Sequence, residues 1–264
     1  MLHTNAISHV EHHAGDQMYI DFTGDRLEIV DKTTAEERKV EMFVAILPCS
    51  HYTYCEAVRT QKKEDLIRAC EDAIRFYGGA PCAIVPDNLK SVVTRSDRNE
   101  PVINPDFESF AEHYGCAVVP ARVRHLRDKA LVENAVKLMY RSAYVYLEGM
   151  VFHALEWLNG AILRSLEKFN ARNLPRRRES RSQLFDSVER GCLRPLSANR
   201  YQMRQRAVAT VQRNSYVTLN KRHYSVPVQY VGKRVDMVFD TDTIDIFHGF
   251  THLSTHHRND APYE

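Results

Sequence analysis

Three carboxylates have the residue types and positions that could hold a metal ion. Asp21 lies in the alternating stretch MYIDF, Asp87 follows the apolar stretch CAIVP, and Glu133 lies in the helical pattern DKALVENAV. A buried carboxylate is costly unless it has a metal ion, a partner or water. Each also has a simpler interpretation when taken alone. Asp21 could be paired or partly exposed, with Asp25 as the competing ligand. Asp87 stands in a turn-forming Pro-Asp-Asn, and Glu133 could be a solvated helix residue.

The conjunction of the three carboxylates favours chemistry. Two aspartates on strands and one glutamate on a later helix offer oxygen ligands from rigid elements, which two hard Mg²⁺ ions require. Two such ions, about 3.5–4 Å apart, activate a water or a DNA 3′ hydroxyl and stabilise the leaving oxygen of an in-line phosphoryl transfer. The sequence has no glycine-rich Walker loop, so nothing in it favours nucleotide hydrolysis.

The hydrophobic pattern predicts the elements that would carry these residues. Alternating and continuous apolar runs predict strands, and apolar residues at helical spacing predict helices. The expected elements are strands 18–22, 39–48 and 52–60, helix 62–79, strand 81–88, helix 104–115, strand 116–121 and helix 128–147. This βββαβαβα order predicts an α/β fold with a mixed sheet and flanking helices. It is the element order of the ribonuclease-H-like fold.

The second half of the chain has a different pattern. An amphipathic helix is expected over 151–172, followed by a proline and a charged segment. From about residue 214, short β-rich stretches separated by turns predict a small β-barrel. The expected domains are a polar N-terminal tail over 1–16, a ribonuclease-H-like core over 17–150, a helical and basic linker region over 151–212 and a small β-barrel over 213–264.

The net charge of +2 hides a strong asymmetry. Residues 171–234 hold 15 Lys or Arg and 3 Asp or Glu, a balance of +12, and the rest of the chain therefore carries −10. This split predicts that the basic stretch binds a polyanion and that the carboxylates of the other part serve a purpose other than polyanion binding. Candidates for phosphate contacts are Arg176, Arg177, Arg178 and Arg181. The alternative for each arginine is a solvated linker position.

Composition restricts the class of protein further. The sequence has no run of about 18 apolar residues and no apolar segment behind a basic N-terminus, so we expect a cytoplasmic protein without membrane contact. The six cysteines form no CxxC pair, which predicts free thiols and neither a disulfide framework nor a zinc site. The histidines clustered near both ends predict solvated tails.

Several blocks of the sequence resemble one family. DFTGD (21–25), VPDNLK (85–90) and DKALVENAV (128–136) resemble the catalytic blocks of the DDE integrase core in IstA-type transposases of bacterial insertion sequences. The resemblance continues through LFDSVERGCLRPL (184–196) and HYSVPVQYVGKRV (223–235), the latter similar to that family's C-terminal β-barrel. It covers most of the chain from about residue 17 onward, and DNLK together with DKxxVEN is its most specific part.

The resemblance implies roles for individual residues and partners. It makes Asp21, Asp87 and Glu133 the catalytic, metal-binding triad for Mg²⁺, for which Mn²⁺ can substitute, and makes Lys90 and Lys129 phosphate contacts. The implied partners are DNA at the element ends and in the target, an AAA+ ATPase helper, and further copies of the chain on DNA. Family members begin with a helix-turn-helix region that is not present here, so we expect a fragment or a truncated reading frame.

The function expected from these observations is that of a transposase or integrase catalytic region. It would perform metal-dependent DNA cleavage and strand transfer during transposition of an insertion sequence. Two alternatives stay open. One is a truncated DNA-binding remnant of a transposase without catalytic competence, and the other is a ribonuclease-H-like nuclease.

Overall fold

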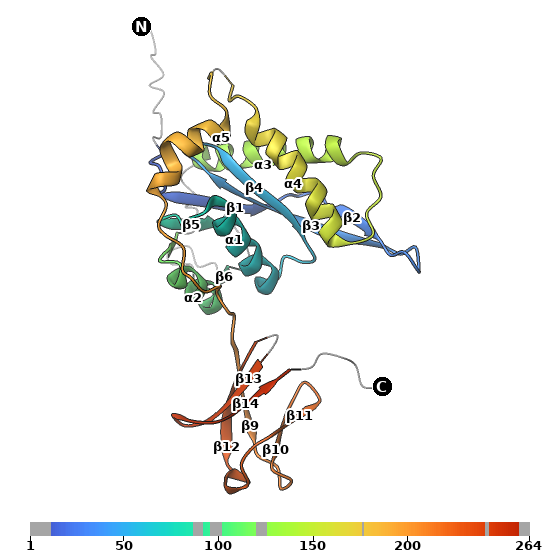
Figure 1. Cartoon of the computed structure of the whole chain (residues 1–264), viewed down its shortest axis with the longest axis vertical. Coiled ribbons are helices and arrows are strands. Elements are labelled where there is room, and N and C mark those ends of the chain that lie inside the picture. Colours follow the sequence, from blue (N-terminus) through green and yellow to red (C-terminus); the bar gives the residue numbers. More distant parts are fainter. Residues whose placement is uncertain are drawn as a thin grey trace. The chain divides into compact units, whose positions relative to one another are not determined.

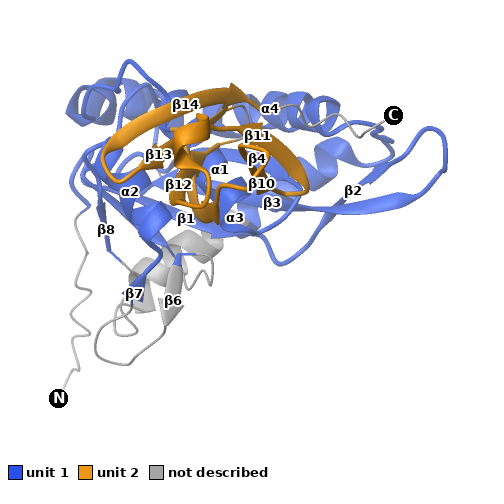
Figure 2. Cartoon of the chain, turned by 90° about the horizontal axis from the view of Figure 1, so that it is seen from below, with its two compact units in different colours: residues 1–201 blue, residues 202–264 orange. Residues whose placement is uncertain are grey.

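The structure is a computed structural model. It describes residues 12–86, 92–95, 102–119, 126–175, 177–240 and 243–258, and within these it leaves the side chains of 93–95 and 126–136 undescribed. The chain divides into two compact units, residues 1–201 and residues 202–264 (Figure 2). Within the described ranges, no helix has both the length and the apolar character needed to cross a membrane.

The first unit is a mixed sheet with helices packed around it (Figure 1). Its strands are β1 (Gln17–Phe22), β2 (Leu27–Val30), β3 (Glu37–Leu47), β4 (Tyr52–Val58), β5 (Ala83–Pro86) and β8 (Ala117–Val118), and β6 (Val93–Arg95) pairs separately with β7 (Val102–Ile103). Its helices are α1 (Lys63–Tyr77), α2 (Pro105–His113), α3 (Leu126–Leu147), α4 (Leu155–Ala171) and α5 (Arg181–Leu184), followed by the π-helical turn η1 (Phe185–Glu189) and the 3-10 turn η2 (Arg190–Cys192).

The sheet confirms the expected α/β class. β3 pairs antiparallel with β1, β2 and β4, whereas β1, β5 and β8 are parallel to one another. All residues of β3 from Val40 to Leu47 are buried, as expected for a strand covered on both faces. The short β2 was not among the expected strands, since only Leu27 of its four residues is fully buried and its pattern is weak.

Local signals explain where the helices begin and end. α1 stops at Gly78, whose φ of 74° is left-handed and whose N–H donates back to the carbonyls of the last turn. α2 begins after Asn104, whose side chain accepts a hydrogen bond from Asp106 N at 3.0 Å, and Pro105 occupies its first position. The end of α1 and the start of α2 therefore fall where the sequence places a glycine stop and an asparagine cap.

Helix α4 covers the free edge of the sheet. Asn170 accepts from Thr53 N at 3.1 Å and donates to Thr53 O at 2.8 Å. Asn159 likewise accepts a hydrogen bond from Ala57 N at 2.7 Å and donates one to Ala57 O at 3.0 Å. Both residues of β4 point these backbone groups away from β3, so the two asparagine side chains take the place of a further strand.

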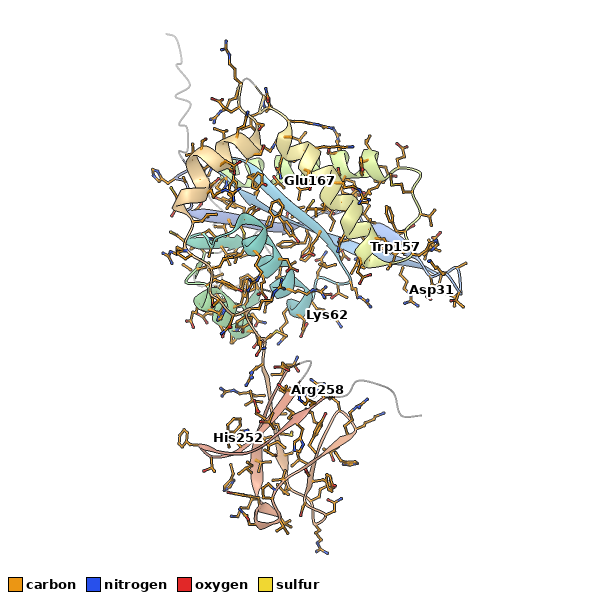
Figure 3. The ribbon with its side chains drawn as sticks, in the orientation of Figure 1. Asp31, Lys62, Trp157, Glu167, His252 and Arg258 are labelled. Carbon is orange, nitrogen blue, oxygen red and sulfur yellow. The ribbon has the colours of Figure 1, made fainter. Side chains whose placement is uncertain are left out.

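The β2–β3 hairpin is attached to the start of α4. Val30 N donates to Phe152 O at 2.8 Å, and His153 Nδ1 lies 2.9 Å from Val30 O. At the tip, near Asp31, the Lys32 ammonium lies 4.6 Å from the ring centre of Trp157 (Figure 3). These contacts fix the hairpin against the helix.

Among its described residues, the second unit has strands and one short 3-10 turn as its regular elements. Its elements are β9 (Gln205–Thr210), β10 (Tyr216–Leu219), β11 (Arg222–Ser225), the 3-10 turn η3 (Val228–Tyr230), β12 (Arg234–Phe239), β13 (Thr243–His248) and β14 (Thr251–His257). β14, β13, β12 and β9 form an antiparallel sheet in that order, and β10 and β11 form a separate hairpin. Residues of both sheets, such as Val217 and Met237, share one core.

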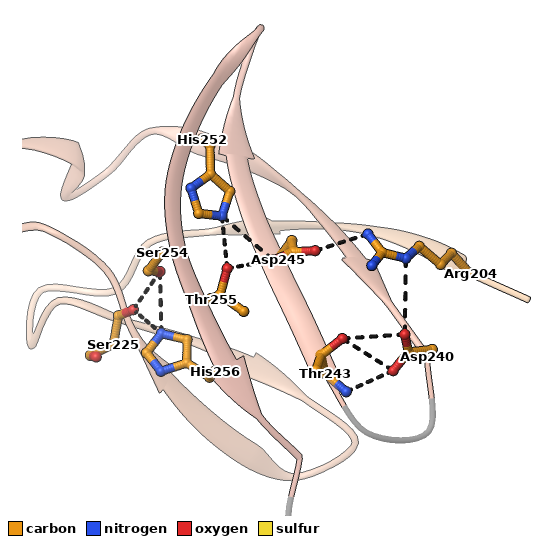
Figure 4. Close-up of polar contacts among 9 residues, drawn as sticks. All are labelled: Arg204, Ser225, Asp240, Thr243, Asp245, His252, Ser254, Thr255 and His256. Atoms are coloured by element: carbon orange, nitrogen blue, oxygen red, sulfur yellow. Dashed lines mark hydrogen bonds and ion pairs between the residues drawn. The ribbon is translucent and has the colours of Figure 1, made fainter. Parts of the chain in front are cut away.

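The small β-barrel expected over 213–264 corresponds in the structure to antiparallel sheets, without a closed barrel among the described residues. Within 202–240 and 243–258, no backbone ladder joins β14 to β11. Side chains occupy that seam instead, because His256 Nε2 lies 2.8 Å from Ser225 O and Ser254 Oγ donates to the same carbonyl at 3.2 Å (Figure 4). The unit is therefore a pair of antiparallel sheets around one core.

The segment expected as a separate linker region, 151–212, is divided between the units. α4 packs on β4 and α3 within the first unit, and β9 belongs to the second. The structure places the division between Tyr201 and Gln202. Tyr201 itself packs against Phe110 and His113 of α2, which explains why the chain up to this residue belongs to the first unit.

Candidate active site

The parallel strands β1 and β5 end side by side. Ile20 lies opposite Pro86 in the last described pair, and the next residues in the sequence are Asp21 and Asp87. Asp21 is half-buried, opposite Val44 of β3, and its Oδ1 accepts a hydrogen bond from the following backbone N–H at 2.8 Å. Carboxyl ends of strands are where α/β sheets bind ligands. Asp87 and Lys90 lie outside the described residues.

The opposite end of β1 is anchored by the block 184–196. Glu189 of η1 is fully buried, and its carboxylate accepts hydrogen bonds from Ser50 N at 3.0 Å, from the Ser50 hydroxyl and from Gly15 N at 3.4 Å. Burial raises the pKa of Glu189 against the lowering effect of these donors. A Cβ on Gly15 would lie 2.6 Å from the carbonyl oxygen of Cys192, so only glycine fits here.

The same block also holds the lead-in to β5. Arg194 and Ala80 exchange two backbone hydrogen bonds, of 2.8 and 2.9 Å. Cys82 N donates to Gly15 O at 2.9 Å, which joins the starts of the two strands. Because both strands are fixed at their starts, their carboxyl ends are held in register, and this positions Asp21.

Helix α3 packs against β1 and β3 and carries Glu133. The side chain of Glu133 is outside the described residues. Met139 and Ala143 are fully buried and mark the inward face of α3, and Tyr140 is half-buried at its border. Burial, and then the carboxylate of Asp25, raise the pKa of Tyr140. Position 133 precedes Tyr140 by seven residues, which is about 10 Å along the axis and on the same face of an α-helix.

The described side chains include no cluster of potential metal ligands. No three His, Cys, Asp or Glu residues of that part gather closely enough to hold a metal ion. Asp87 and the side chain of Glu133 lie outside it, so the expected triad stays a prediction. The carboxylate chemistry of the three positions fits a hard divalent cation. All six cysteines are free thiols.

The expected phosphate contacts fall into three groups. Arg177 and Arg178 are exposed, as a contact to DNA requires. Lys129 lies in α3 with its side chain outside the described residues, and Arg176 is outside them altogether. These four positions, together with Lys90 outside the described residues, remain expectations.

The structure contradicts the expected phosphate contact of Arg181. It is only 7% exposed, its guanidinium lies 4.1 Å from the ring centre of Phe169, and Nη1 donates to Phe169 O at 3.2 Å and Arg172 O at 3.4 Å. Burial lowers the pKa of this guanidinium. Arg181 therefore satisfies carbonyls at the end of α4 and is not available to phosphates.

Tyr140 is the residue near this site that the sequence analysis did not single out. Its ring stacks on Tyr144 with centroids 5.8 Å apart. The available signal was its spacing of seven residues from Glu133, which puts both positions on one helix face.

Comparison with known proteins agrees with this architecture. Residues 11–125 match the family described as integrase core domain, and residues 196–263 match the family described as Mu transposase C-terminal domain. These two segments are therefore similar to an integrase core domain and to a Mu transposase C-terminal domain, respectively.

Two individual relatives are named as candidate transposases. The chain is 32% identical over 249 residues to a protein of Burkholderia multivorans named as a candidate transposase for insertion sequence IS408, covering 94% of this chain and 48% of that protein. It is 34% identical to a candidate transposase of Sinorhizobium fredii, with the same two coverages. The chain thus spans about half the length of these curated relatives.

A solved structure shares the fold. A chain of the intasome of simian T-cell lymphotropic virus, solved in complex with PP2A regulatory subunit B56 gamma, aligns with a TM-score of 0.52 and 13% identity over 92% of this chain and 76% of that chain. At this identity the likeness concerns the fold alone.

Proposed function

We propose that this chain is the catalytic region of an insertion-sequence transposase, a polynucleotidyl transferase that cleaves DNA and joins a 3′ hydroxyl to target DNA. The observation that carries the proposal is the register of β1 with β5, which ends one residue before Asp21 and Asp87 in an integrase core domain. The packing of α3 on β1 supports Glu133 as the third member.

In this proposal Asp21, Asp87 and Glu133 hold divalent metal, Mg²⁺ by preference and Mn²⁺ as a substitute. The metal supplies charge stabilisation to a phosphoryl transfer and lowers the pKa of the attacking hydroxyl. The chain's own contribution is positioning. Asp21 stands at the end of a strand that is anchored at its start through Glu189 and Gly15, and the hydrogen bond from Phe22 N orients its carboxylate.

The proposed partners follow from the same chemistry. DNA at the element ends and in the target would be held by Lys90, Lys129, Arg176, Arg177 and Arg178, whose charges neutralise phosphates without reading sequence. We further propose that copies of the chain assemble on DNA and that an AAA+ ATPase helper selects the target. The exposure of Arg177 and Arg178 supports the DNA contact.

Joining of pre-cut DNA ends tests the proposal. Protein with Mg²⁺ or Mn²⁺ is expected to join such ends to a target duplex, and Asp21→Asn, Asp87→Asn and Glu133→Gln are each expected to lower joining by roughly 10³-fold or more, since each removes a metal ligand. Asp25→Asn is the matched control, because this carboxylate is exposed in the turn after β1, and it should retain joining.

Three outcomes would contradict the proposal. If Asp21→Asn retains joining and Asp25→Asn abolishes it, the metal ligand on this segment is Asp25 and not Asp21. Absence of joining by the folded wild-type protein, with DNA binding intact, would favour a DNA-binding remnant. Hydrolysis of RNA–DNA hybrids without joining would favour a ribonuclease-H-like nuclease.

A further inference from the structure

One exposed side of α3 alternates cationic and aromatic side chains beyond Glu133. Tyr140 and Tyr144 stack with ring centroids 5.8 Å apart and planes 28° apart. Tyr144 is 52% exposed, and Lys137 and Arg141 are exposed as well. We call Lys137, Tyr140, Arg141 and Tyr144 the aromatic face of α3.

This face runs along the helix away from the proposed active site. At about 100° per residue, positions 133, 137, 140 and 144 lie within an arc of about 60° around the axis. Tyr140 is half-buried, and burial and then the carboxylate of Asp25, four residues beyond Asp21, raise the pKa of its hydroxyl. A strand that leaves the carboxylate site along α3 would therefore pass these rings.

We propose that the aromatic face of α3 binds an unpaired DNA strand, whose bases stack on Tyr140 and Tyr144 while its phosphates lie near Lys137 and Arg141. The location of this strand at the reaction centre rests on the proposed function, whereas the stacking does not. Aromatic rings interleaved with cations bind single strands without sequence preference, because every base has a face that stacks.

Neighbouring charges determine how the strand lies. Asp25, whose carboxylate contributes to the raised pKa of Tyr140, is exposed, and Glu148 is exposed one turn beyond Tyr144. Both carboxylates repel phosphates, so the sugar-phosphate chain must follow Lys137 and Arg141, with its bases turned to the rings. Glu148 marks the end of the face.

Charge and ring geometry favour a single strand over other occupants. A duplex keeps its bases paired and stacked internally and presents phosphates and base edges along its length. It would therefore use the two cations and offer the rings no base face to stack on. A second copy of the chain would have to bring acidic groups to Lys137 and Arg141 and cover both rings.

Fluorescence of a base analogue tests the proposal. A thymine oligonucleotide carrying one 2-aminopurine, titrated with the full chain in EDTA, should lose emission on binding as the analogue stacks. Tyr144→Ala should weaken binding at least about fivefold and restore most of the emission, since each base–ring stack contributes on this scale. Tyr144→Phe and Tyr140→Phe keep the rings and should bind as wild type.

Trp157→Ala is the matched control, because Trp157 is 58% exposed on another helix. Tyr140→Ala should weaken binding in the same way as Tyr144→Ala. If this variant loses structure, photocrosslinking of a 5-iodouracil oligonucleotide to the wild-type chain replaces it, and the crosslink should map to Tyr140 or Tyr144. The proposal is overturned if Tyr144→Ala leaves affinity and emission unchanged, if Trp157→Ala weakens binding equally, if the crosslink maps elsewhere, or if a duplex binds with the same dependence on Tyr144.

The result separates this inference from the proposed function. Because EDTA removes metal, stacking is measured without catalysis. If the protein stacks bases on Tyr144 but joins no DNA ends, the single-strand proposal is supported and the proposed transferase activity is refuted. Joining that is unaffected by Tyr144→Ala, together with unchanged binding, would retain the transferase and reject the face.

Discussion

The carboxylates of Glu189, which is buried, and Glu56, which is half-buried, have surroundings that differ from those of Asp21. Glu189 is satisfied by backbone and hydroxyl donors from two other segments, which suits a structural role. Glu56 on β4 has a buried Oε1 without a hydrogen-bond partner among the described residues, and burial, with the Asp72 carboxylate next in effect, raises its pKa to about 7. Asp21 stands half-buried at a strand end. Position and partners, more than residue type, separate these roles.

The Glu56 carboxyl predicts a pH-dependent stability. Its pKa rises from 4.5 to about 7 on folding, so the folded state binds the proton more tightly and loses stability as pH increases from about 4.5 through 7. Glu56→Gln removes this loss, and at pH 8 it should be more stable than wild type by up to about 3 kcal/mol. At pH 4 the two should be nearly equal.

Urea unfolding at pH 4 and pH 8 measures this difference. Glu112→Gln, an exposed glutamate on α2, is the control and should change stability little at either pH. A difference between Glu56→Gln and wild type that is the same at both pH values would refute the linkage.

At the level of elements, α4 contributes more than a covering helix. Asn159 and Asn170, eleven residues apart, both bond the backbone of β4 at its free edge. An uncovered edge strand offers unpaired N–H and C=O groups to other chains. The asparagines therefore close the sheet against edge-to-edge association.

Asn170→Ala should expose this dependence. Asn170 is 3% exposed, and its loss leaves Thr53 N and O buried without partners, which should lower the free energy of unfolding by roughly 2 kcal/mol. Denaturant midpoints measure the loss, and light scattering on warming should show earlier aggregation. Asn173→Ala, at an exposed position just beyond α4, should do neither. Equal effects of the two substitutions would rule out the edge contact as the cause.

Helices and strands with a strong hydrophobic pattern could be predicted from the sequence, and those with a weak pattern could not. β1, β3, β4, α1 and α2 were expected from long apolar runs, helical periodicity and glycine stops. β9 has alternation in QRAVAT but lies in the basic segment, so it was read as linker. Arg181 could not be predicted as buried, since its partners are carbonyls of α4 that only tertiary packing brings near. The open seam between β14 and β11 likewise depends on side chains far apart in sequence.

The candidate site was predictable in part. The order of Asp21, Asp87 and Glu133 on two strands and a helix came from pattern and resemblance, and the register of β1 with β5 is in keeping with it. Tyr140 was missed, because the effect of the Asp25 carboxylate on its pKa depends on how the helix packs on the sheet. Sequence patterns place residues on elements but do not show which residues from different elements meet.

At the scale of the whole molecule, the two units have separate cores. Ile246 is fully buried in the core of the second unit, and Ile46 is 1% exposed in the sheet of the first. Truncation of either to alanine should cost roughly 2–5 kcal/mol through lost burial and a cavity. Each loss should be confined to its own unit.

Hydrogen exchange read by mass spectrometry measures this separation. Ile246→Ala should reduce protection in β12 and β13 and leave β3 as in wild type, and Ile46→Ala should do the reverse. Uniform loss of protection in both units from either substitution would indicate one cooperative molecule instead of two units.

The metal site at the ends of β1 and β5 is the central claim. Anomalous diffraction from crystals soaked in Mn²⁺ tests it most directly. We expect anomalous peaks bound by the carboxylates of Asp21, Asp87 and Glu133, and their loss in Asp21→Asn crystals. Mn²⁺ bound elsewhere, with these three carboxylates apart from one another and from the metal, would contradict the account.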